Sequence, residues 1–455
     1  MTRLNKFIPS KAFALTILSV AIPLMLQQLI TTSVNLIDNL MVGQLGDYAI
    51  GAVSSVNRFY IISTFSTNGV LAACAIYIAQ YFGAENEEKM KETFRFSIWI
   101  AILFGFVFMG IGYLGASSIM HYFTPYEEVI SLGTQYLKII CFGFIPLAIS
   151  SAIATSMRSI GKTKTPMYIS AVAVILNTLL NYCLIFGHFG FPTLGVIGAA
   201  IATLLARIVE VVIYIVVTIR RKYPFTSALK YCLHIPTSLV KRIMIKAAPL
   251  AFNEVLWSFG TATLFKFYST RGAEVMSGYS ISTTISDIFF ILAAGMAAAT
   301  TILISQPLGA NRLEEARDNA YKIMGFTFCL SILFGCIMMV AANVVPNFYQ
   351  VSELAKQSAT AYLQVMSVLF WIYLLNAQCY FILRAGGDTK STLMMDAGYM
   401  WTVNMPIVFA FTYYSNVSFI VLYMIGQTTD VIKLVIAYRF VKKEKWVVNL
   451  AHHHE

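Results

Sequence analysis

The chain has 455 residues, of which 58% are hydrophobic and only 12% are charged, and its mean hydropathy is +0.72. Soluble domains carry about 25% charged residues, so this composition excludes an ordinary soluble enzyme or binding module. The net charge of +11 does not indicate a nucleic-acid surface, because the basic residues lie in short loops between apolar runs.

Apolar runs long enough to cross a bilayer recur along the whole chain. They are continuous rather than alternating, which favours helices over the strands of a barrel. The first run is too long for a signal-peptide core and lacks a cleavage site, so we expect it to be the first membrane helix. The predicted spans are 12–39, 50–82, 95–117, 131–157, 166–187, 195–218, 242–269, 276–306, 320–345, 358–383, 392–412 and 417–440.

Basic residues gather on alternate loops between these spans. One side carries Lys89, Lys91, Arg95, Arg158, Lys162, Lys164, the segment 219–246, Arg312, Arg317, Lys322, Arg384, Lys390 and the tail YRFVKKEKW, whereas the other carries only Arg271 and Lys356. By the positive-inside rule we expect a multi-pass protein of the cytoplasmic (inner) membrane with both termini in the cytoplasm. The seven cysteines are scattered without a CxxC pair and are interpreted as packing residues.

The two halves of the chain match at an offset of 226 residues. AIPLMLQQL (21–29) aligns with AAPLAFNEV (247–255), IYIAQYFGA (76–84) with ILISQPLGA (302–310), and RSIGKTK (158–164) with RAGGDTK (384–390). Six spans per half give both copies the same orientation, so their symmetry axis should lie along the membrane normal. We therefore expect an all-α membrane protein with twelve transmembrane helices, in two pseudo-symmetric six-helix lobes around a central cleft.

The expected domain boundaries follow from this repeat. An N-lobe covers 1–225, a cytoplasmic linker 226–241 and a C-lobe 242–446, and the tail 447–455 ends in AHHHE, which looks like the remnant of a tag.

Several polar residues lie inside the predicted spans, where ionisable groups mark functional sites by default. Gln28, Thr31, Asn35 and Asp38 follow a spacing of three, four and three that places them on one face of the first helix. Asn177 and Asn181 likewise share a face of the fifth span, and Glu254 lies within the seventh. A purely structural hydrogen-bonding role remains an alternative for Asp38, for Glu254 and for Asp287 in the eighth span.

The chain resembles the multidrug and toxic compound extrusion (MATE) transporters over nearly its whole length. The resemblance lies in NLIDNLMVGQLG (35–46), AQYFGAEN (79–86), RSIGKTKTP (158–166) and NTLLNYCLIFGHFGFPTLGVIGAAIAT (177–203). It implies antiport of amphipathic, often cationic organic compounds against H⁺ or Na⁺ by a rocker-switch cycle, with no cofactor.

The resemblance also implies a set of cation-coupling residues. It places Asn177 and Asn181 near Asp38 in an N-lobe cation site that could hold Na⁺, to which Thr203 and Asn35 are added. One branch of the family usually has Asp where this chain has Asn181, so one negative charge is missing. In the C-lobe, Glu254 matches an acid that NorM-like and eukaryotic members use for coupling. In NAQCYFILRAGGD, Asn376 takes the place of a further family acid.

Further residues are candidates for the substrate cavity or for hinges. The cavity candidates are Gln28, Asn376, Gln378, Asp287, Trp257, Met296, Phe289 and Tyr373. Pro23 and its repeat partner Pro249 are the expected hinges, because proline bends a helix. Glu210 follows Arg207 by three residues and should pair with it, whereas Asp396 and Asp430 are interpreted as structural.

The predicted function is a cation-coupled multidrug efflux antiporter. A flippase for a lipid-linked or amphipathic metabolite with a related fold is the alternative, although such proteins usually have more spans and a cationic cavity. No hydrolase or protease motif indicates an enzyme, and no segment between spans is long enough for a sensor domain. The expected partners are membrane lipid and small organic cations, with the protein a monomer and no nucleic acid bound.

Overall fold

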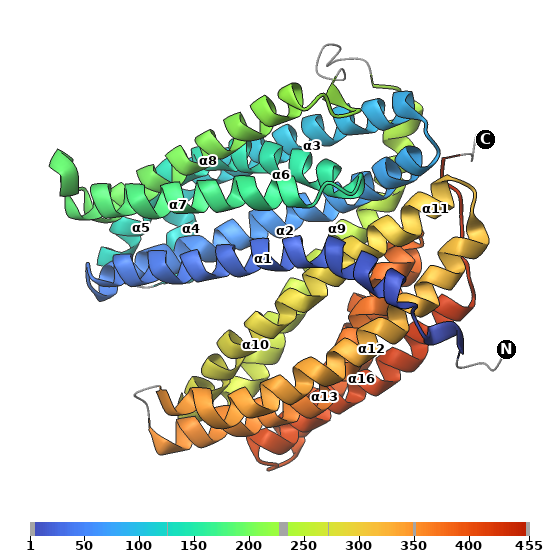
Figure 1. The fold of residues 1–455 in the computed structure, drawn as a ribbon. Coiled ribbons are helices and arrows are strands. Elements are labelled where there is room, and N and C mark those ends of the chain that lie inside the picture. Colours follow the sequence, from blue (N-terminus) through green and yellow to red (C-terminus); the bar gives the residue numbers. More distant parts are fainter. Residues whose placement is uncertain (1–4, 125, 227–234, 272, 349–351, 452–455) are drawn as a thin grey trace. The chain divides into compact units, whose positions relative to one another are not determined.

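The computed structural model describes residues 5–124, 126–226, 235–271, 273–348 and 352–451. The secondary structure within these ranges is entirely helical (Figure 1). Each of the twelve expected spans coincides with helix there, and ten helical segments of the described chain are long and apolar enough to cross a membrane. The expectation of an all-α membrane protein is therefore confirmed.

The chain divides into two compact units at two repeat-related points. The N-unit comprises 26–251, and the C-unit comprises 1–25 together with 252–455. Each change of unit lies two residues after a proline within a continuous helix, Pro23 in α1 (Lys11–Gly43) and Pro249 in α9 (Thr237–Ser269). The first part of α1 therefore packs in the C-unit, and the first part of α9 packs in the N-unit. These two segments are exchanged relative to the expected lobes 1–225 and 242–446.

The N-unit is a bundle of helices that follow one another along the chain. Besides its parts of α1 and α9, it contains α2 (Asp47–Gly83), α3 (Glu87–Leu114), α4 (Ala116–Phe123), α5 (Glu127–Ile140), α6 (Phe144–Ser159), α7 (Lys164–Phe186) and α8 (Gly195–Arg220). α2 packs on α3, α5 and α6, and α7 packs along α8. The α7–α8 contact is close because Gly198 has no side chain: a Cβ there would lie 2.4 Å from the carbonyl oxygen of Leu184.

The C-unit is organised around α13. Its helices are α10 (Ala273–Thr300), α11 (Gln306–Gly309), α12 (Leu313–Val344), α13 (Glu353–Ala385), α14 (Thr389–Leu393), α15 (Met405–Tyr414) and α16 (Phe419–Lys442). α13 packs against α10, α12 and α16. Between α14 and α15 the chain continues as two π-helical segments, Met394–Gly398 and Met400–Asn404.

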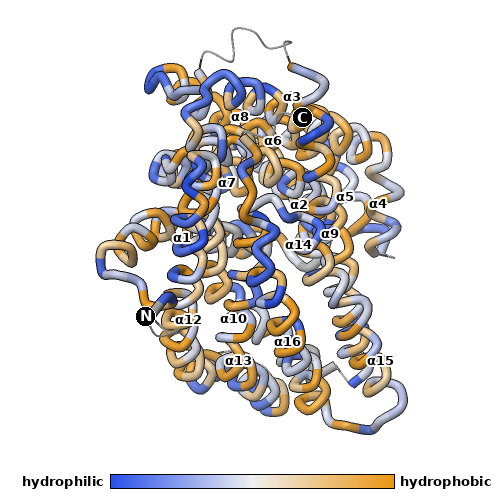
Figure 2. The backbone as a smooth tube through the Cα atoms, turned by 90° about the vertical axis from the view of Figure 1, so that its right-hand side faces the viewer, coloured by the Kyte–Doolittle hydropathy of each residue, from blue (hydrophilic) through white to orange (hydrophobic). Residues whose placement is uncertain are grey.

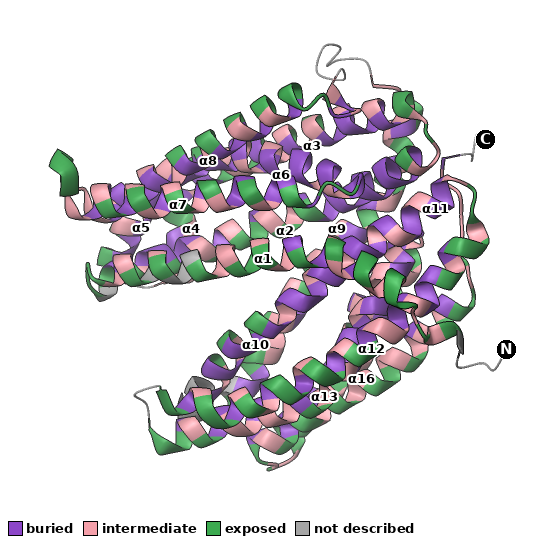
Figure 3. Ribbon diagram, viewed as in Figure 1, coloured by how far each residue is buried: buried purple, intermediate pink, exposed green. Residues whose placement is uncertain are grey.

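Large apolar side chains remain exposed on the outer faces of both units. Leu103 on α3 is 54% exposed and Val340 on α12 is 65% exposed. Figure 2 shows hydrophobic residues running along the helices, and Figure 3 shows buried and exposed positions recurring along each of them. Such extended apolar surface is unfavourable in water but is what a lipid-facing helix requires.

Candidate functional site

A cavity of about 470 Å³ lies inside the N-unit and is lined by polar residues from several of its helices. Its walls come from α1, α2, α5, α7 and α8. The polar and charged residues that line it are Gln28, Thr31, Asp38, Asn57, Tyr60, Thr64, Tyr136, Ser170, Asn177, Asn181, Thr203, Arg207 and Glu210. The structure thus brings Asp38, both asparagines and Thr203 to one place, as the resemblance implied.

Asp38 and Asn181 make a direct contact in this cavity. The Asn181 Nδ2 donates a 2.7 Å hydrogen bond to Asp38 Oδ1, which joins α1 to α7. Only 1% of Asn181 is exposed, and its Oδ1 accepts no hydrogen bond from the described residues. Because a buried amide oxygen is normally paired, this oxygen marks a position for an added donor or cation.

Asn177 lies one turn before Asn181 on the same face of α7. Its Nδ2 donates a 3.3 Å hydrogen bond to Thr203 Oγ1 on α8. The cavity therefore offers a carboxylate from α1, amide oxygens from α7 and a hydroxyl from α8. These are the oxygen donors with which proteins replace the hydration shell of an alkali cation.

The cavity also contains an ion pair within α8. Arg207 Nη1 lies 2.8 Å from Glu210 Oε2, which confirms the expected pair. The side chain of Glu210 is 7% exposed and that of Arg207 is 29% exposed. The pair is internally neutral, so Asp38 supplies the remaining negative charge of this wall. The sequence did not place Arg207 in the cavity, because the pairing pattern alone is equally typical of a solvated helix face.

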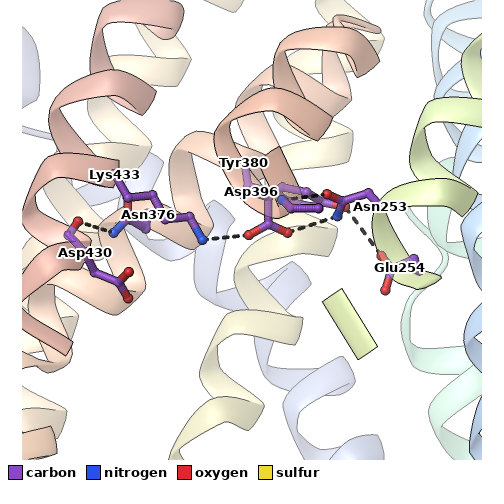
Figure 4. A network of polar contacts seen from close by, with 8 residues as sticks. Asn253, Glu254, Asn376, Tyr380, Asp396, Asp430 and Lys433 are labelled. Atoms are coloured by element: carbon purple, nitrogen blue, oxygen red, sulfur yellow. Dashed lines mark hydrogen bonds and ion pairs between the residues drawn. The ribbon is translucent and has the colours of Figure 1, made fainter. Parts of the chain in front are cut away.

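A second polar network lies inside the C-unit and is drawn in Figure 4. Lys433 Nζ on α16 lies 2.6 Å from Asp396 Oδ1 in the first π-helical segment. The other oxygen of this carboxylate, Asp396 Oδ2, accepts a 2.9 Å hydrogen bond from Asn253 Nδ2 on α9. Asn253 is held in turn by the backbone N–H of Ala397, which donates to its Oδ1 at 3.1 Å.

Two predicted residues flank this network. The Tyr380 hydroxyl donates to Glu254 Oε1 at 3.5 Å, and Glu254 is half-buried. Asn376 is 4% exposed and donates from Nδ2 to the backbone oxygen of Asp430 at 3.0 Å, while its Oδ1 has no partner among the described residues. Asp396, previously interpreted as merely structural, is thus the carboxylate at the centre of the C-unit network.

The two networks occupy equivalent positions in the repeat. Gln27 Nε2 donates to Ser170 Oγ at 2.7 Å, and residues 226 positions further on, Asn253 and Asp396, make the corresponding bond at 2.9 Å. The hydrogen bond between Asn404 and Thr429 in the C-unit, 2.8 Å long, corresponds in the same way to that between Asn177 and Thr203.

Asn404 lies 227 residues after Asn177, one residue more than the repeat offset of 226. The two π-helical segments, the second of which ends at Asn404, explain the difference, because a π-helical turn contains about one more residue than an α-helical turn. The extra residue is thus accommodated without displacing Asn404 from its partner on α16.

The acid–amide pair of the N-unit has no counterpart in the C-unit. The equivalents of Asp38 and Asn181 are Leu264 and, one residue beyond the offset, Val408. Both belong to an apolar cluster with Tyr268 and Phe419. The two units therefore share a hydrogen-bonding framework but carry their charged groups at different points of it.

The remaining cavity candidates are distributed between the two units. Gln28 lines the N-unit cavity. Gln378 is instead fully buried between helices, where its Nε2 donates to Thr300 at 2.8 Å and its Oε1 accepts from Thr327 at 3.1 Å. Its role is structural, because both ends of the amide are already satisfied by the protein.

The apolar candidates belong mainly to the core. Met296 is 1% exposed, and Phe289 is 8% exposed with its ring edge-on to Phe370. Tyr373 packs with its ring centroid 4.5 Å from that of Phe290. Methionine and aromatic side chains at helical spacing fit a core as well as a cavity, so the sequence could not separate the two.

Three further predicted residues complete the set. Asp287 and Trp257 are exposed on α10 and α9. The side chain of Asn35 lies outside the described part of the structure. Within that part, no group of three or more His, Cys, Asp or Glu residues is arranged to hold a metal ion.

Comparisons with known proteins agree with this architecture. The MatE family model matches residues 23–183 and 249–410, one match in each half of the chain. The probable multidrug resistance protein YoeA of Bacillus subtilis is 24% identical over 440 residues, covering 94% of each chain. The probable multidrug resistance protein NorM of Halalkalibacterium halodurans is 26% identical over 400 residues, covering 86% of this chain and 85% of its own.

Solved structures show the same fold. A MOP superfamily transporter from Pyrococcus furiosus superposes with a TM-score of 0.87 at 16% identity, covering 98% of both chains. A multidrug resistance MATE family transporter in an outward-facing conformation also gives 0.87 at 17% identity, covering 95% of this chain and 96% of the other. The chain belongs to the MatE family, the multidrug and toxic compound extrusion transporters, and is a membrane transporter rather than an enzyme.

Proposed function

We propose that this protein is a multidrug efflux antiporter that exports amphipathic, often cationic organic compounds in exchange for H⁺ or Na⁺. Membership of the MatE family and the names of its relatives support multidrug transport. The single observation that carries the coupling is the contact between Asp38 and Asn181 inside the N-unit cavity, beside an unpartnered amide oxygen. By the positive-inside rule, the protein lies in the cytoplasmic membrane with both termini in the cytoplasm, and we propose that it acts as a monomer.

The N-unit cavity performs the coupling through its one unneutralised carboxylate. Asp38, the Oδ1 of Asn181 and the hydroxyl of Thr203 form the set of oxygen donors for the inorganic cation. A proton would bind to Asp38 alone. In either case the incoming cation neutralises the carboxylate of Asp38. When that cation leaves to the cytoplasm, the carboxylate regains its negative charge and attracts an organic cation. Competition for one carboxylate thus couples the two fluxes.

The concentration gradient of the inorganic cation is the energy source for this exchange. A one-for-one exchange of monovalent cations moves no net charge, so each tenfold gradient of H⁺ or Na⁺, worth about 1.4 kcal/mol, can sustain up to about a tenfold gradient of the organic cation. Alternating access requires the units to reorient, and the changes of unit beside Pro23 and Pro249 support these prolines as hinges. The proposed cycle includes a cleft between the two units and a rocking movement of one unit against the other.

The charge of the N-unit cavity favours this proposal over a flippase for lipid-linked anions. A flippase of that kind needs cationic groups free to bind phosphate. Arg207 is instead paired with Glu210 at 2.8 Å, and Asp38 leaves the wall acidic.

Transport assays in proteoliposomes test the proposal directly. The vesicles contain a fluorescent organic cation, and a proton gradient and a sodium gradient are imposed in separate experiments. We expect one of them to drive movement of the dye in wild type but not in Asp38→Asn. Asp318→Asn, an exposed acid near the start of α12, is the matched control and should behave as wild type. Movement of the dye that responds to neither gradient would contradict antiport.

A further inference from the structure

Lys433 is a lysine ammonium held inside the C-unit. Its side chain is 17% exposed, and that of its partner Asp396 is 15% exposed. Withdrawing a lysine from water is costly unless a carboxylate compensates for the lost hydration. The 2.6 Å contact between Nζ and Oδ1 supplies that compensation.

The repeat shows how specific this arrangement is to the C-unit. Lys433 lies 226 positions after Arg207, so both cations occupy the same point of the last helix of their repeat. Arg207 pairs within its own helix with Glu210. Lys433 instead reaches a neighbouring helical segment, where Asp396 replaces Ser170 of the first repeat. The ion pair between Lys433 and Asp396 therefore has no counterpart at the equivalent positions of the first repeat, although the hydrogen-bonding framework around it is shared.

The surroundings of the ammonium have the composition of a cation site. Both oxygens of Asp396 are engaged, one by Lys433 and the other by Asn253. Asp430 lies one turn before Lys433 on α16, so the same helix carries a second carboxylate near this point. The buried amide of Asn376 donates to the backbone of Asp430 and leaves its Oδ1 unpartnered among the described residues. Two carboxylates and a buried amide oxygen thus accompany one fixed positive charge.

We propose that the Lys433 ammonium is a built-in cation that fills a monovalent-cation site of the C-unit formed with Asp396, Asp430 and Asn376. A permanently tethered ammonium prevents this site from taking up or releasing an inorganic cation. Lys433 then determines whether this site contributes to the number of coupling ions that the protein binds. The inference concerns the C-unit alone and holds whichever ion Asp38 binds.

Removal of the ammonium should uncover the site. The experiment measures equilibrium binding of ²²Na⁺ to the purified full-length protein. All variants for this measurement carry Asp38→Asn, so the proposed N-unit site cannot contribute. We expect Lys433→Gln to bind Na⁺ saturably, with close to one ion per chain, whereas Lys433→Arg retains a fixed cation and binds none. Adding Asp396→Asn to Lys433→Gln should abolish the new binding.

Folding is checked by size-exclusion chromatography and thermal unfolding in detergent. A folded Lys433→Gln variant that binds no more Na⁺ than its Asp38→Asn parent overturns the inference. Because the proposed N-unit site is already removed, this failure is distinct from failure of the proposed function.

A second variant keeps the inference testable if Lys433→Gln does not fold. Asp396→Asn in the otherwise wild-type chain keeps the ammonium and removes the carboxylate that pairs with it. It should bind as much Na⁺ as wild type, because Asp396 does not contact an exchangeable ion while Lys433 is present. A loss of Na⁺ binding in this variant would show that Asp396 already serves as an ion ligand, and would overturn the inference.

Discussion

Arg207 and Lys433 occupy equivalent positions in the two repeats, yet they pair with acids in different places. Arg207 contacts Glu210 one turn along its own helix, and Lys433 contacts Asp396 in a neighbouring π-helical segment. The first pairing leaves Asp38 as the free acid of the N-unit cavity. The second joins two membrane segments of the C-unit. At these repeat positions the same framework thus holds an ion pair within one helix in the N-unit and an ion pair between two segments in the C-unit.

Asp38→Asn should abolish gradient-driven transport without unfolding the protein. The amide preserves the shape of the side chain but removes the one unneutralised negative charge of the cavity wall. Dye efflux from proteoliposomes should fall to the level of protein-free vesicles under both proton and sodium gradients. Wild-type rates with unchanged thermal stability would rule out Asp38 as the coupling acid.

Asn181→Asp should strengthen cation binding in the N-unit. A second carboxylate would then stand 2.7 Å from Asp38, and two such groups favour a shared cation or proton. We expect the affinity for ²²Na⁺ to rise roughly tenfold, equivalent to about 1.4 kcal/mol. The double variant Asp38→Asn/Asn181→Asp moves the single charge across the pair and should retain part of the binding. An unchanged affinity in Asn181→Asp would place the ion elsewhere.

Arg207→Met should destabilise the protein more than removal of the whole ion pair. The single change leaves Glu210, whose side chain is 7% exposed, without its cation. We expect a loss of about 1–3 kcal/mol, since cavity water screens part of the charge. Arg207→Met/Glu210→Leu removes both charges and should recover most of the loss. Thermal unfolding in detergent compares the three proteins, and equal stability of the two variants would contradict the argument.

Pro23→Ala and Pro249→Ala should slow transport while leaving cation binding intact. Proline inside a helix removes a backbone hydrogen bond and costs roughly 3 kcal/mol relative to alanine, so each replacement should also raise thermal stability. A straighter, stiffer helix at a change of unit would resist reorientation. Measuring dye efflux together with ²²Na⁺ binding separates the two effects. Full transport activity in both variants would dismiss the hinge role.

Gly198→Ala should weaken the α7–α8 contact that aligns Asn177 with Thr203. The added Cβ would lie 2.4 Å from the backbone oxygen of Leu184, so the helices must separate. Gly110→Ala on α3 is the matched control, because a Cβ there meets nothing within 4 Å. We expect a lower unfolding temperature for Gly198→Ala, and no decrease for Gly110→Ala, in which alanine favours the helix by roughly 0.5–1 kcal/mol. Equal unfolding temperatures would contradict this account.

The sequence predicted the N-unit site more completely than the C-unit site, and the reason is physical. Spacing along one helix predicted that Asn177 and Asn181 share a face, and the family resemblance implied that Asp38 of another helix lies near them. The Lys433–Asp396 pair joins different helical segments, one of them π-helical, and neither spacing nor the resemblance pointed to it. Only its position relative to Arg207 in the repeat could have drawn attention to Lys433.

The sequence by itself determined the spans, the duplication and the polar stripes, because bilayer thickness and helical periodicity act on local stretches of chain. Only the tertiary structure decided where the units divide, since the first parts of α1 and α9 pack within the opposite halves. It also placed Met296 and Phe289 in the core rather than in a cavity. These outcomes depend on which faces meet across the bundle, and no single segment of the sequence carries that information.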